Sequence, residues 1–245
     1  MGSIITFYSY KGGVGRSMAL ANVAYLLAEK GARVLIVDWD LEAPGLEKYF
    51  SNYIRDTKGE GLLQMLLSVK HNKYPNYRDY IWDITIEPNV SLSLLHSGKE
   101  SNPDYSTQLE HFDWKHFFSE DTGGSFLEEL RETWKKDYDF VLIDSRTGLS
   151  DISGVCTIFL PDIIVPMFTA NYQSLYGTRD IMRLAQSARQ KLAFDRMALT
   201  ILPVPTRFGT RAEFRVSQEW LDRFSEDLKE FYTDWLPAWV SPKLI

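Results

Sequence analysis

The sequence predicts an α/β protein with a doubly wound, mostly parallel sheet and helices on both faces. Short apolar runs of strand character alternate along the chain with segments of helical periodicity. A glycine-rich segment, residues 9–17, joins the first apolar run to the first helical segment. Two further apolar runs end in aspartate, at Asp38 and Asp144, and open parallel sheets bind their ligands at that edge. We therefore expect one ligand-binding domain over residues 1–245.

Composition narrows the class of protein. Of the 245 residues, 44% are hydrophobic and 24% are charged, which suffices for one globular core. No apolar run approaches the roughly 18 residues that a membrane span needs, and because the first run begins almost at the first residue we expect no signal peptide. The single cysteine, Cys156, fits a reducing compartment, so we expect a cytoplasmic protein that does not bind membranes. The net charge of -6 disfavours a broad nucleic-acid surface.

The glycine-rich segment has the context of a phosphate-binding loop. Ile4 to Tyr8 is expected to form a strand, and Met18 to Lys30 a helix. Glycines lack a Cβ, so the loop between them can turn several backbone N–H groups toward an anion. The start of the helix adds its dipole, and Ser17 stands where such loops hold Mg²⁺. The alternative is a glycine-rich turn before an ordinary helix.

The loop departs from the ordinary pattern G-x-x-x-x-G-K-[ST]. Tyr10 stands where the first glycine belongs, Arg16 replaces the lysine, and a further cation, Lys11, lies at the front. The string KGGVGRS resembles the deviant Walker A box of the MinD/ParA family of P-loop ATPases, in a variant spelling. The resemblance covers nearly the whole chain outside residues 46–125. It implies ATP and Mg²⁺ as ligands.

The second apolar run, Arg33 to Asp38, is expected to be a buried parallel strand. Asp38 and Asp40 follow at the ligand edge of the sheet. By the resemblance, Asp40 orients or activates the attacking water, and Asp38 supports the Mg²⁺ and its water network. The alternative is a solvated acidic turn.

Residues 46–125 are an aromatic-rich insertion relative to the rest. Within it we expect a helix over residues 61–69 and a strand over residues 90–95. Aromatic side chains are frequent here and lie among charges. They form either a partner surface or a satellite core under long loops. The aromatic residues are Tyr53, Tyr74, Tyr77, Tyr80, Trp82, Trp114, Phe117 and Phe118.

A helix over residues 125–135 and a strand over residues 138–144 are expected next. The apolar strand ending in Asp144 is a Walker B pattern, which places a carboxylate near Mg²⁺. By the resemblance, the amide of Gly148 reaches the γ-phosphate and senses it. Arg146 is either an arginine finger or a structural ion-pair partner.

The last third predicts strands over residues 162–168 and 197–204 and helices over residues 174–191 and 216–232. By the resemblance, the loop after the second strand touches the nucleotide base, so Pro205 and Arg207 are candidates. No N-K-x-D guanine box occurs, and the resemblance favours ATP over GTP. Arg207, Arg211 and Arg215 form either a face for an acidic partner or a solvated surface. The tail lacks a clear strand, so the resemblance implies a further module beyond it.

The resemblance assigns the site as follows. Catalytic roles fall to Lys11, Asp40 and Arg16. Nucleotide binding involves Gly12, Gly13, Val14, Gly15, Arg16, Ser17, Met18, Gly148, Pro205 and Arg207. Metal binding involves Ser17, Asp38 and Asp144.

The resemblance also implies a function. Two chains close face to face over two ATP molecules, and Lys11 reaches the phosphates of the other chain. The expected function is an ATP-hydrolysing dimerisation switch that regulates a protein effector or a C-terminal module, with nucleic acid a less favoured partner. Since guanidinium and ammonium are not interchangeable at a tight phosphate site, a nucleotide-binding module with little hydrolysis is the alternative. A bacterial tyrosine kinase would share these boxes, but no tyrosine follows Tyr232.

Overall fold

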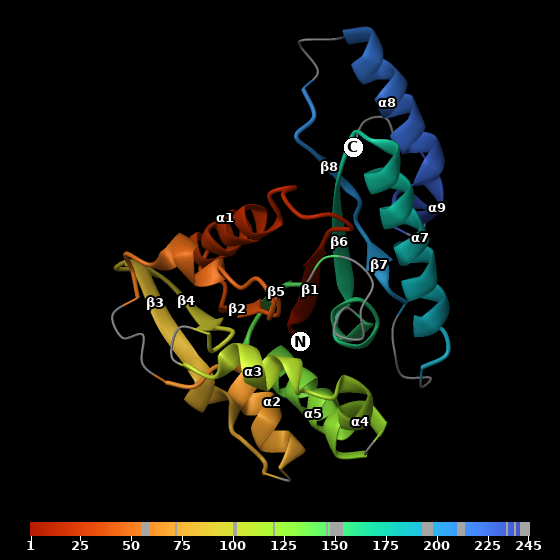
Figure 1. The fold of residues 1–245 in the computed structure, drawn as a ribbon. Helices are drawn as coiled ribbons and strands as arrows, with labels where there is room; N and C mark the ends of the chain where they lie inside the picture. Colours follow the sequence, from red (N-terminus) through yellow and green to blue (C-terminus); the bar gives the residue numbers. More distant parts are fainter. Residues whose placement is uncertain are drawn as a thin grey trace.

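The computed structural model shows an α/β molecule built around one sheet (Figure 1). It describes residues 1–54, 59–71, 73–99, 102–119, 121–145, 147, 154–192, 198–209, 214–233, 235–237 and 239–240. The sheet has eight strands in the order β3-β4-β2-β5-β1-β6-β7, and β8 pairs with β6. Every pair is parallel except β3 with β4, which confirms the predicted sheet.

The elements have these bounds. The strands are β1 (Ser3–Tyr8), β2 (Val34–Asp38), β3 (Ile81–Glu87), β4 (Val90–Leu95), β5 (Phe140–Asp144), β6 (Ile163–Thr169), β7 (Thr200–Ile201) and β8 (Val204–Thr206). The α-helices are α1 (Arg16–Glu29), α2 (Leu62–Lys70), α3 (Tyr105–Glu110), α4 (Trp114–Ser119), α5 (Asp121–Asp137), α7 (Tyr172–Arg189), α8 (Phe214–Asp227) and α9 (Lys229–Tyr232). Shorter helical turns are η1 (Leu46–Phe50), η2 (Tyr77–Tyr80) and the π-helical η3 (Val155–Phe159).

Helices cover both faces of the sheet, because apolar side chains point both ways from its strands. In β1, Phe7 packs with the apolar side of α1, and Ile4 points to the opposite face. That face is covered by α2 and α5 (Figure 1). Tyr8 lies on the same side as Ile4 and packs with Leu175 of α7. β2 and β5 are buried in the middle of the sheet, as their uninterrupted apolar runs predict.

The aromatic-rich residues 46–125 build one edge of the sheet and part of a helical layer. The predicted helix and strand are confirmed as α2 and β4. The sequence analysis missed β3, which pairs antiparallel with β4. Its sequence, IWDITIE, does alternate, with Trp82 and Ile84 buried and Asp83 and Thr85 exposed. This period of two was the available signal.

Most of the aromatic side chains in this region belong to the core. The buried ones are Tyr77, Tyr80, Trp82, Trp114 and Phe117. Tyr53 and Tyr74 are exposed, by 40% and 84%, and the side chain of Phe118 lies outside the described part. The satellite-core interpretation therefore holds for the buried members, because they contact α2 and α5 or pack beneath α1.

The C-terminal elements differ from the predicted ones. The strand expected over residues 197–204 is divided into β7 and β8, both parallel to β6, with Leu202 and Pro203 between them. Pro203 has no N–H to donate to a ladder, which is why pairing stops there. The helix expected over residues 216–232 is divided at Leu228 into α8 and α9. Helix α7 begins two residues before the predicted start, where the Asn171 side chain accepts the Ser174 N–H.

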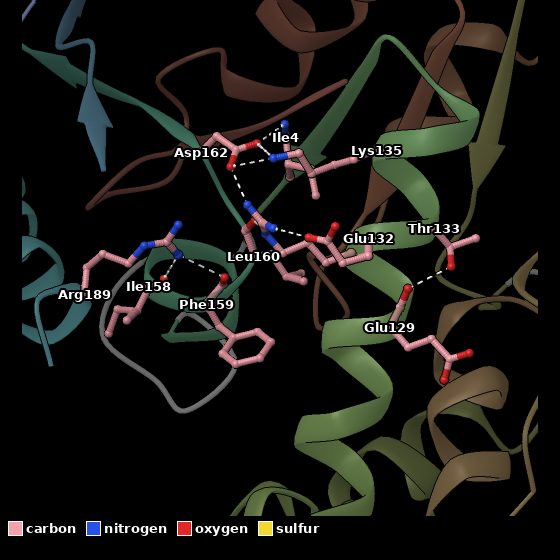
Figure 2. Close-up of polar contacts among 11 residues, drawn as sticks. Ile4, Glu129, Glu132, Thr133, Lys135, Ile158, Phe159, Leu160, Asp162 and Arg189 are labelled. Atoms are coloured by element: carbon pink, nitrogen blue, oxygen red, sulfur yellow. Dashed lines mark hydrogen bonds and ion pairs between the residues drawn. The ribbon is translucent and has the colours of Figure 1, made fainter. Parts of the chain in front are cut away.

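Two buried arginines hold the carbonyl groups at the end of η3 (Figure 2). Arg131 of α5 donates from Nε to the Leu160 carbonyl at 3.0 Å. Arg189 of α7 donates to the carbonyls of Ile158 and Phe159 at 2.7 and 3.1 Å. The last carbonyls of a helix lack partners within it. These side chains satisfy them and tie η3 to two different helices.

Arg131 also pairs with Asp162, which accepts the Ile4 N–H at 3.0 Å and contacts Lys135 at 3.0 Å. Arg131→Met is expected to lower the free energy of unfolding by about 3 kcal/mol, because it leaves a mostly buried carboxylate short of its strongest partner. Lys135 still contacts Asp162 in the variant and limits the loss of stability. Urea denaturation measures the free energy of unfolding.

The matched control is Arg33→Met. Arg33 forms the same kind of pair with Asp139, but the two side chains are 58% and 45% exposed. Solvent screens exposed pairs, so the loss of this one is expected to be small. Equal losses in the two variants would contradict the structural role assigned to Arg131.

Candidate functional site

Strand register brings the three sequence boxes to one edge of the sheet. In the β2–β5 pair, Asp38 lies opposite Asp144. In the β1–β5 pair, Phe7 lies opposite Asp144, so the loop that follows Tyr8 begins beside both carboxylates. This is the carboxyl edge of the parallel strands, where α/β sheets bind ligands.

A cleft of about 440 Å³ opens at this edge. Its walls come from the glycine loop, the start of α1, the turn after β2, η1, and two later loops. The residues that line it are Ser9, Gly12, Gly13, Val14, Gly15, Arg16, Ser17, Asp40, Ala43, Tyr49, Thr147 and Arg207.

The loop has the shape that phosphate binding requires. Gly13 and Gly15 have φ angles of 77° and 90°, in the left-handed region that favours glycine. A Cβ built on Gly12 or Gly13 would meet no atom within 4 Å, so an open cradle lies over the backbone. Helix α1 begins at Arg16, two residues before the predicted start. Its first N–H groups have no partners within the helix, so they add to those of the loop as donors suited to an anion.

Arg16 is buried and is shared between two carboxylates. It is 7% exposed. Its Nε donates to Asp144, and Nη2 donates to Asp40 at 2.8 Å. Burial opposes the charged form, but the charges of Asp144 and Asp40 outweigh it, so the pKa of Arg16 is raised. The guanidinium stays charged and joins the end of β5 to the turn after β2.

Asp38 organises the turn that carries Asp40. Its carboxylate accepts the N–H groups of Gly45 and Leu46 at 3.0 Å each, and that of Asp40 at 3.2 Å. Burial, reinforced by the charge of Asp144, raises the pKa of Asp38 to about 7 against these hydrogen bonds. The contacts of Asp38 are thus with backbone groups, and its part in metal binding stays a prediction.

Ser17 and Asp144 form a donor set suited to Mg²⁺. The Ser17 hydroxyl donates to the Asp144 carboxylate. Burial raises the pKa of Asp144, while Arg16 and this hydrogen bond oppose the rise. Within the described residues, no group of three or more histidine, cysteine or acidic side chains could hold a metal. One carboxylate and one hydroxyl still fit Mg²⁺, which usually takes its other ligands from phosphates and water.

Of the other predicted site residues, one lines the cleft, three lie outside its wall and one lies outside the described residues. Arg207 lines the cleft with a φ of 51°, a strained conformation for a residue other than glycine. Lys11 and Met18 are exposed outside the cleft wall, and Pro205 lies in β8. Gly148 lies outside the described residues.

The predicted arginine cluster does not form one patch in the described part of the chain. Arg207 faces the cleft, whereas Arg215 pairs with Glu219 on the exposed side of α8. Arg146 and Arg211 lie outside the described residues.

Sequence reasoning missed four residues of the cleft wall. Ser9 and Thr147 lie inside stretches that the motifs had already marked. Ala43 follows Asp40 in the acidic turn, so its proximity was a local signal. Tyr49 reaches the cleft from η1, and no motif marks it because its approach depends on how that turn packs.

The glycine loop between β1 and α1, with Asp144 beside it, defines the class as a P-loop NTPase fold. The chain belongs to the AAA domain family, whose model matches residues 2–198. Within that class it is MinD/ParA-like, which confirms the resemblance predicted from the loop.

Curated relatives include the septum site-determining protein MinD of Helicobacter pylori, 29% identical over 153 residues, or 61% of this chain and 46% of the relative. A probable plasmid-partitioning protein ParA of Thermus thermophilus is 26% identical over 215 residues, or 85% of this chain and 59% of the relative. The chain thus spans about half the length of the curated relatives it matches.

Solved structures share the fold. MinD of Pyrococcus horikoshii, complexed with Mg-ADP, has a TM-score of 0.64 at 22% identity and covers 90% of this chain and 77% of its own. A Cyanothece McdA variant complexed with ATP has a TM-score of 0.67 at 19% identity, with coverages of 94% and 80%. In the described part of the chain, no helix has the length and apolar character to cross a membrane.

Proposed function

We propose that this protein is a Mg·ATP-binding and ATP-hydrolysing switch. Two copies dimerise over the nucleotide in the cytoplasm and regulate an attached or partner effector. The observation that carries the proposal is that the glycine loop, Ser17 and Asp40 line one cleft, with Asp144 hydrogen-bonded to Ser17. A glycine loop alone supports phosphate binding, whereas the added carboxylates also support hydrolysis.

The nucleotide would bind along the loop. Its phosphates would accept the backbone N–H groups from Gly12 to Met18, and Arg207 adds a positive charge from a distant part of the chain. Ser17 and Asp144 would hold Mg²⁺, which neutralises phosphate charge. The Mg-ADP and ATP complexes of the MinD and McdA structures support this assignment. Asp38 would act indirectly, by holding the turn that carries Asp40.

Two further contacts come from the resemblance. Gly148 would donate its amide to the γ-phosphate, and Pro205 would lie near the base.

Arg16 would serve as the phosphate-binding cation of the loop. A guanidinium binds phosphate through two parallel N–H bonds, as it binds carboxylates. Phosphate oxygens would therefore compete with Asp40 and Asp144 for Arg16. Asp40, released from this pair, would accept a hydrogen bond from the attacking water and orient it toward the γ-phosphate.

The alternative is a nucleotide-binding module with little turnover. The observation that favours it is the ion pair between Arg16 and Asp40 at 2.8 Å, because a carboxylate held there cannot orient water. Measured turnover separates the two functions.

The dimer proposal involves Lys11. This side chain is exposed at the front of the loop, and in the proposed dimer it would reach the second copy. Its charge would then neutralise phosphates bound to the other chain.

The test of the proposed function is phosphate release from ATP with Mg²⁺, for the wild type and for Asp40→Ala. We expect turnover in the wild type and a loss of roughly a hundredfold or more in the variant, within the range for a positioned proton-accepting group. Asp83→Ala is the control, since Asp83 is an exposed carboxylate on β3.

Unchanged turnover in Asp40→Ala would remove the catalytic role from this residue. Binding of ATP without release of phosphate in the wild type would favour the alternative function.

A further inference from the structure

Helix α7 carries a glycine, Gly177, in its interior. Glycine is less favourable than alanine at such a position. Its backbone is not in the left-handed region, so conformational freedom does not explain the residue. The reason for a glycine here is the set of atoms that a side chain at this position would contact. A Cβ on Gly177 would lie 2.6 Å from Cγ of the Tyr10 ring, and closer still to Cδ1 and Cε1.

Tyr10 thus occupies a notch in α7 that only glycine leaves open. Among residues 10–13 of the loop, Tyr10 alone is partly buried, and the other three are exposed. Its ring packs against the apolar cluster that includes Leu175 of α7 and Phe224 of α8. The front of the phosphate loop is therefore attached to α7 through one side chain. Tyr10 is also the residue that replaces the first glycine of the ordinary motif.

The notch lies on a firmly placed helix. The N–H of Thr169, at the end of β6, donates to the Ser174 hydroxyl at 3.2 Å. Arg179, two residues after Gly177, pairs with Asp227 of α8 at 3.0 Å. Contacts of α7 with β6 and α8 thus help to fix the position of Tyr10, which does not depend on its own loop alone.

Lys11 is the neighbour of Tyr10. Its Nζ lies 5.6 Å from the centre of the Tyr10 ring, within the range of a cation–π contact. The ring therefore favours positions of the exposed ammonium group near its face. Displacing the ring from the notch would move both the backbone and the charge of Lys11.

We propose that Tyr10, seated against Gly177, is a positioning residue that sets the reach of Lys11 toward nucleotide bound by a second copy. Helix α7 then controls dimerisation through the front of the loop. A partner that shifts α7 would change dimer affinity without touching the nucleotide. This inference rests on the proposed ATP-dependent dimer.

The test is Gly177→Ala in the full chain, with dimer affinity measured by analytical ultracentrifugation in Mg·ATP. We expect at least a tenfold weaker dimer, since a displaced Lys11 loses part of a charge contact whose complete loss costs more than tenfold in affinity. ATP binding by the monomer, followed with a fluorescent ATP analogue, is expected to persist. The control is Gly124→Ala, a glycine in the first turn of α5 whose added Cβ would meet nothing within 4 Å.

Two comparisons separate a positioning role of Tyr10 from a general loss of folding. In a Lys11→Ala background, measured at protein concentrations high enough for that variant to dimerise, Gly177→Ala is expected to weaken the dimer no further. Tyr10→Phe, which keeps the ring, is expected to retain the dimer, and Tyr10→Ala is expected to lose it. If Gly177→Ala does not fold, the dimer affinities of Tyr10→Phe and Tyr10→Ala in Mg·ATP decide whether Tyr10 positions Lys11. Wild-type dimer affinity in Gly177→Ala, or in Tyr10→Ala, would overturn the proposal.

Hydrogen exchange of the amides of residues 11–13 provides a readout that does not need the dimer. It is expected to become severalfold faster in Gly177→Ala than in the wild type or Gly124→Ala. If the wild type forms no dimer with ATP, the proposed function fails on that point. The exchange rates still decide whether Tyr10 and Gly177 position the loop, and equal rates would overturn that role.

Discussion

Arg16→Ala is expected to abolish phosphate release and to lower the free energy of unfolding by about 3–5 kcal/mol. The stability loss follows because Arg16 bridges Asp144 and Asp40, whose side chains are 3% and 14% exposed. Removing the guanidinium leaves two adjacent carboxylates without their shared cation. Activity is lost because the loop also loses its phosphate-binding charge. Urea denaturation without nucleotide and a phosphate-release assay measure the two effects.

Arg16→Lys is the matched variant, since it restores the ordinary lysine of the motif. Lysine is a point charge and cannot bridge both carboxylates as the planar guanidinium does. We expect this variant to bind ATP and to hydrolyse it at least as fast as the wild type, while being less stable. Phosphate release at the wild-type rate in Arg16→Ala would show that the cation is not part of the site.

Lys11→Ala is expected to abolish ATP-dependent dimers at concentrations where the wild type is dimeric. Truncating one member of a desolvated charge pair across an interface costs about 3 kcal/mol, or roughly a hundredfold in affinity. Analytical ultracentrifugation with and without Mg·ATP measures the loss. Lys30→Ala is the control, because Lys30 is also exposed but lies at the far end of α1.

ATP binding by Lys11→Ala, measured on the same samples, shows whether the chains carry nucleotide. Dimers that persist in loaded Lys11→Ala would remove the proposed reach of this lysine into the second copy. The Tyr10–Gly177 notch would then position a loop that has no part in dimerisation.

The convergence of the boxes was predictable because each box is local. An apolar run, a terminal aspartate and a glycine loop each lie within ten residues of sequence. The parallel order of the strands then brings their carboxyl ends to one edge of the sheet. Asp38 and Asp144 met as expected. Their partners did not follow from the same reasoning. Asp38 holds a turn through backbone N–H groups, and Arg16 contacts the carboxylates predicted for water and metal.

The features that were missed depend on residues far apart in the chain. Whether the aromatics of residues 46–125 faced a partner or the core could not be decided locally, because both use the same residue types. The antiparallel β3 needed its partner β4 to become a strand of the sheet. The division of the last predicted strand likewise depended on pairing with β6.

By itself, the sequence determined the class of fold, the glycine loop and the two aspartate-terminated strands, because hydrophobic period and short motifs encode them locally. Only the tertiary structure decided what those residues contact. Arg16 reaches Asp144 across 128 positions of sequence, and Gly177 makes room for Tyr10 across a comparable distance. Such contacts arise from how strands and helices pack, and no local pattern specifies them.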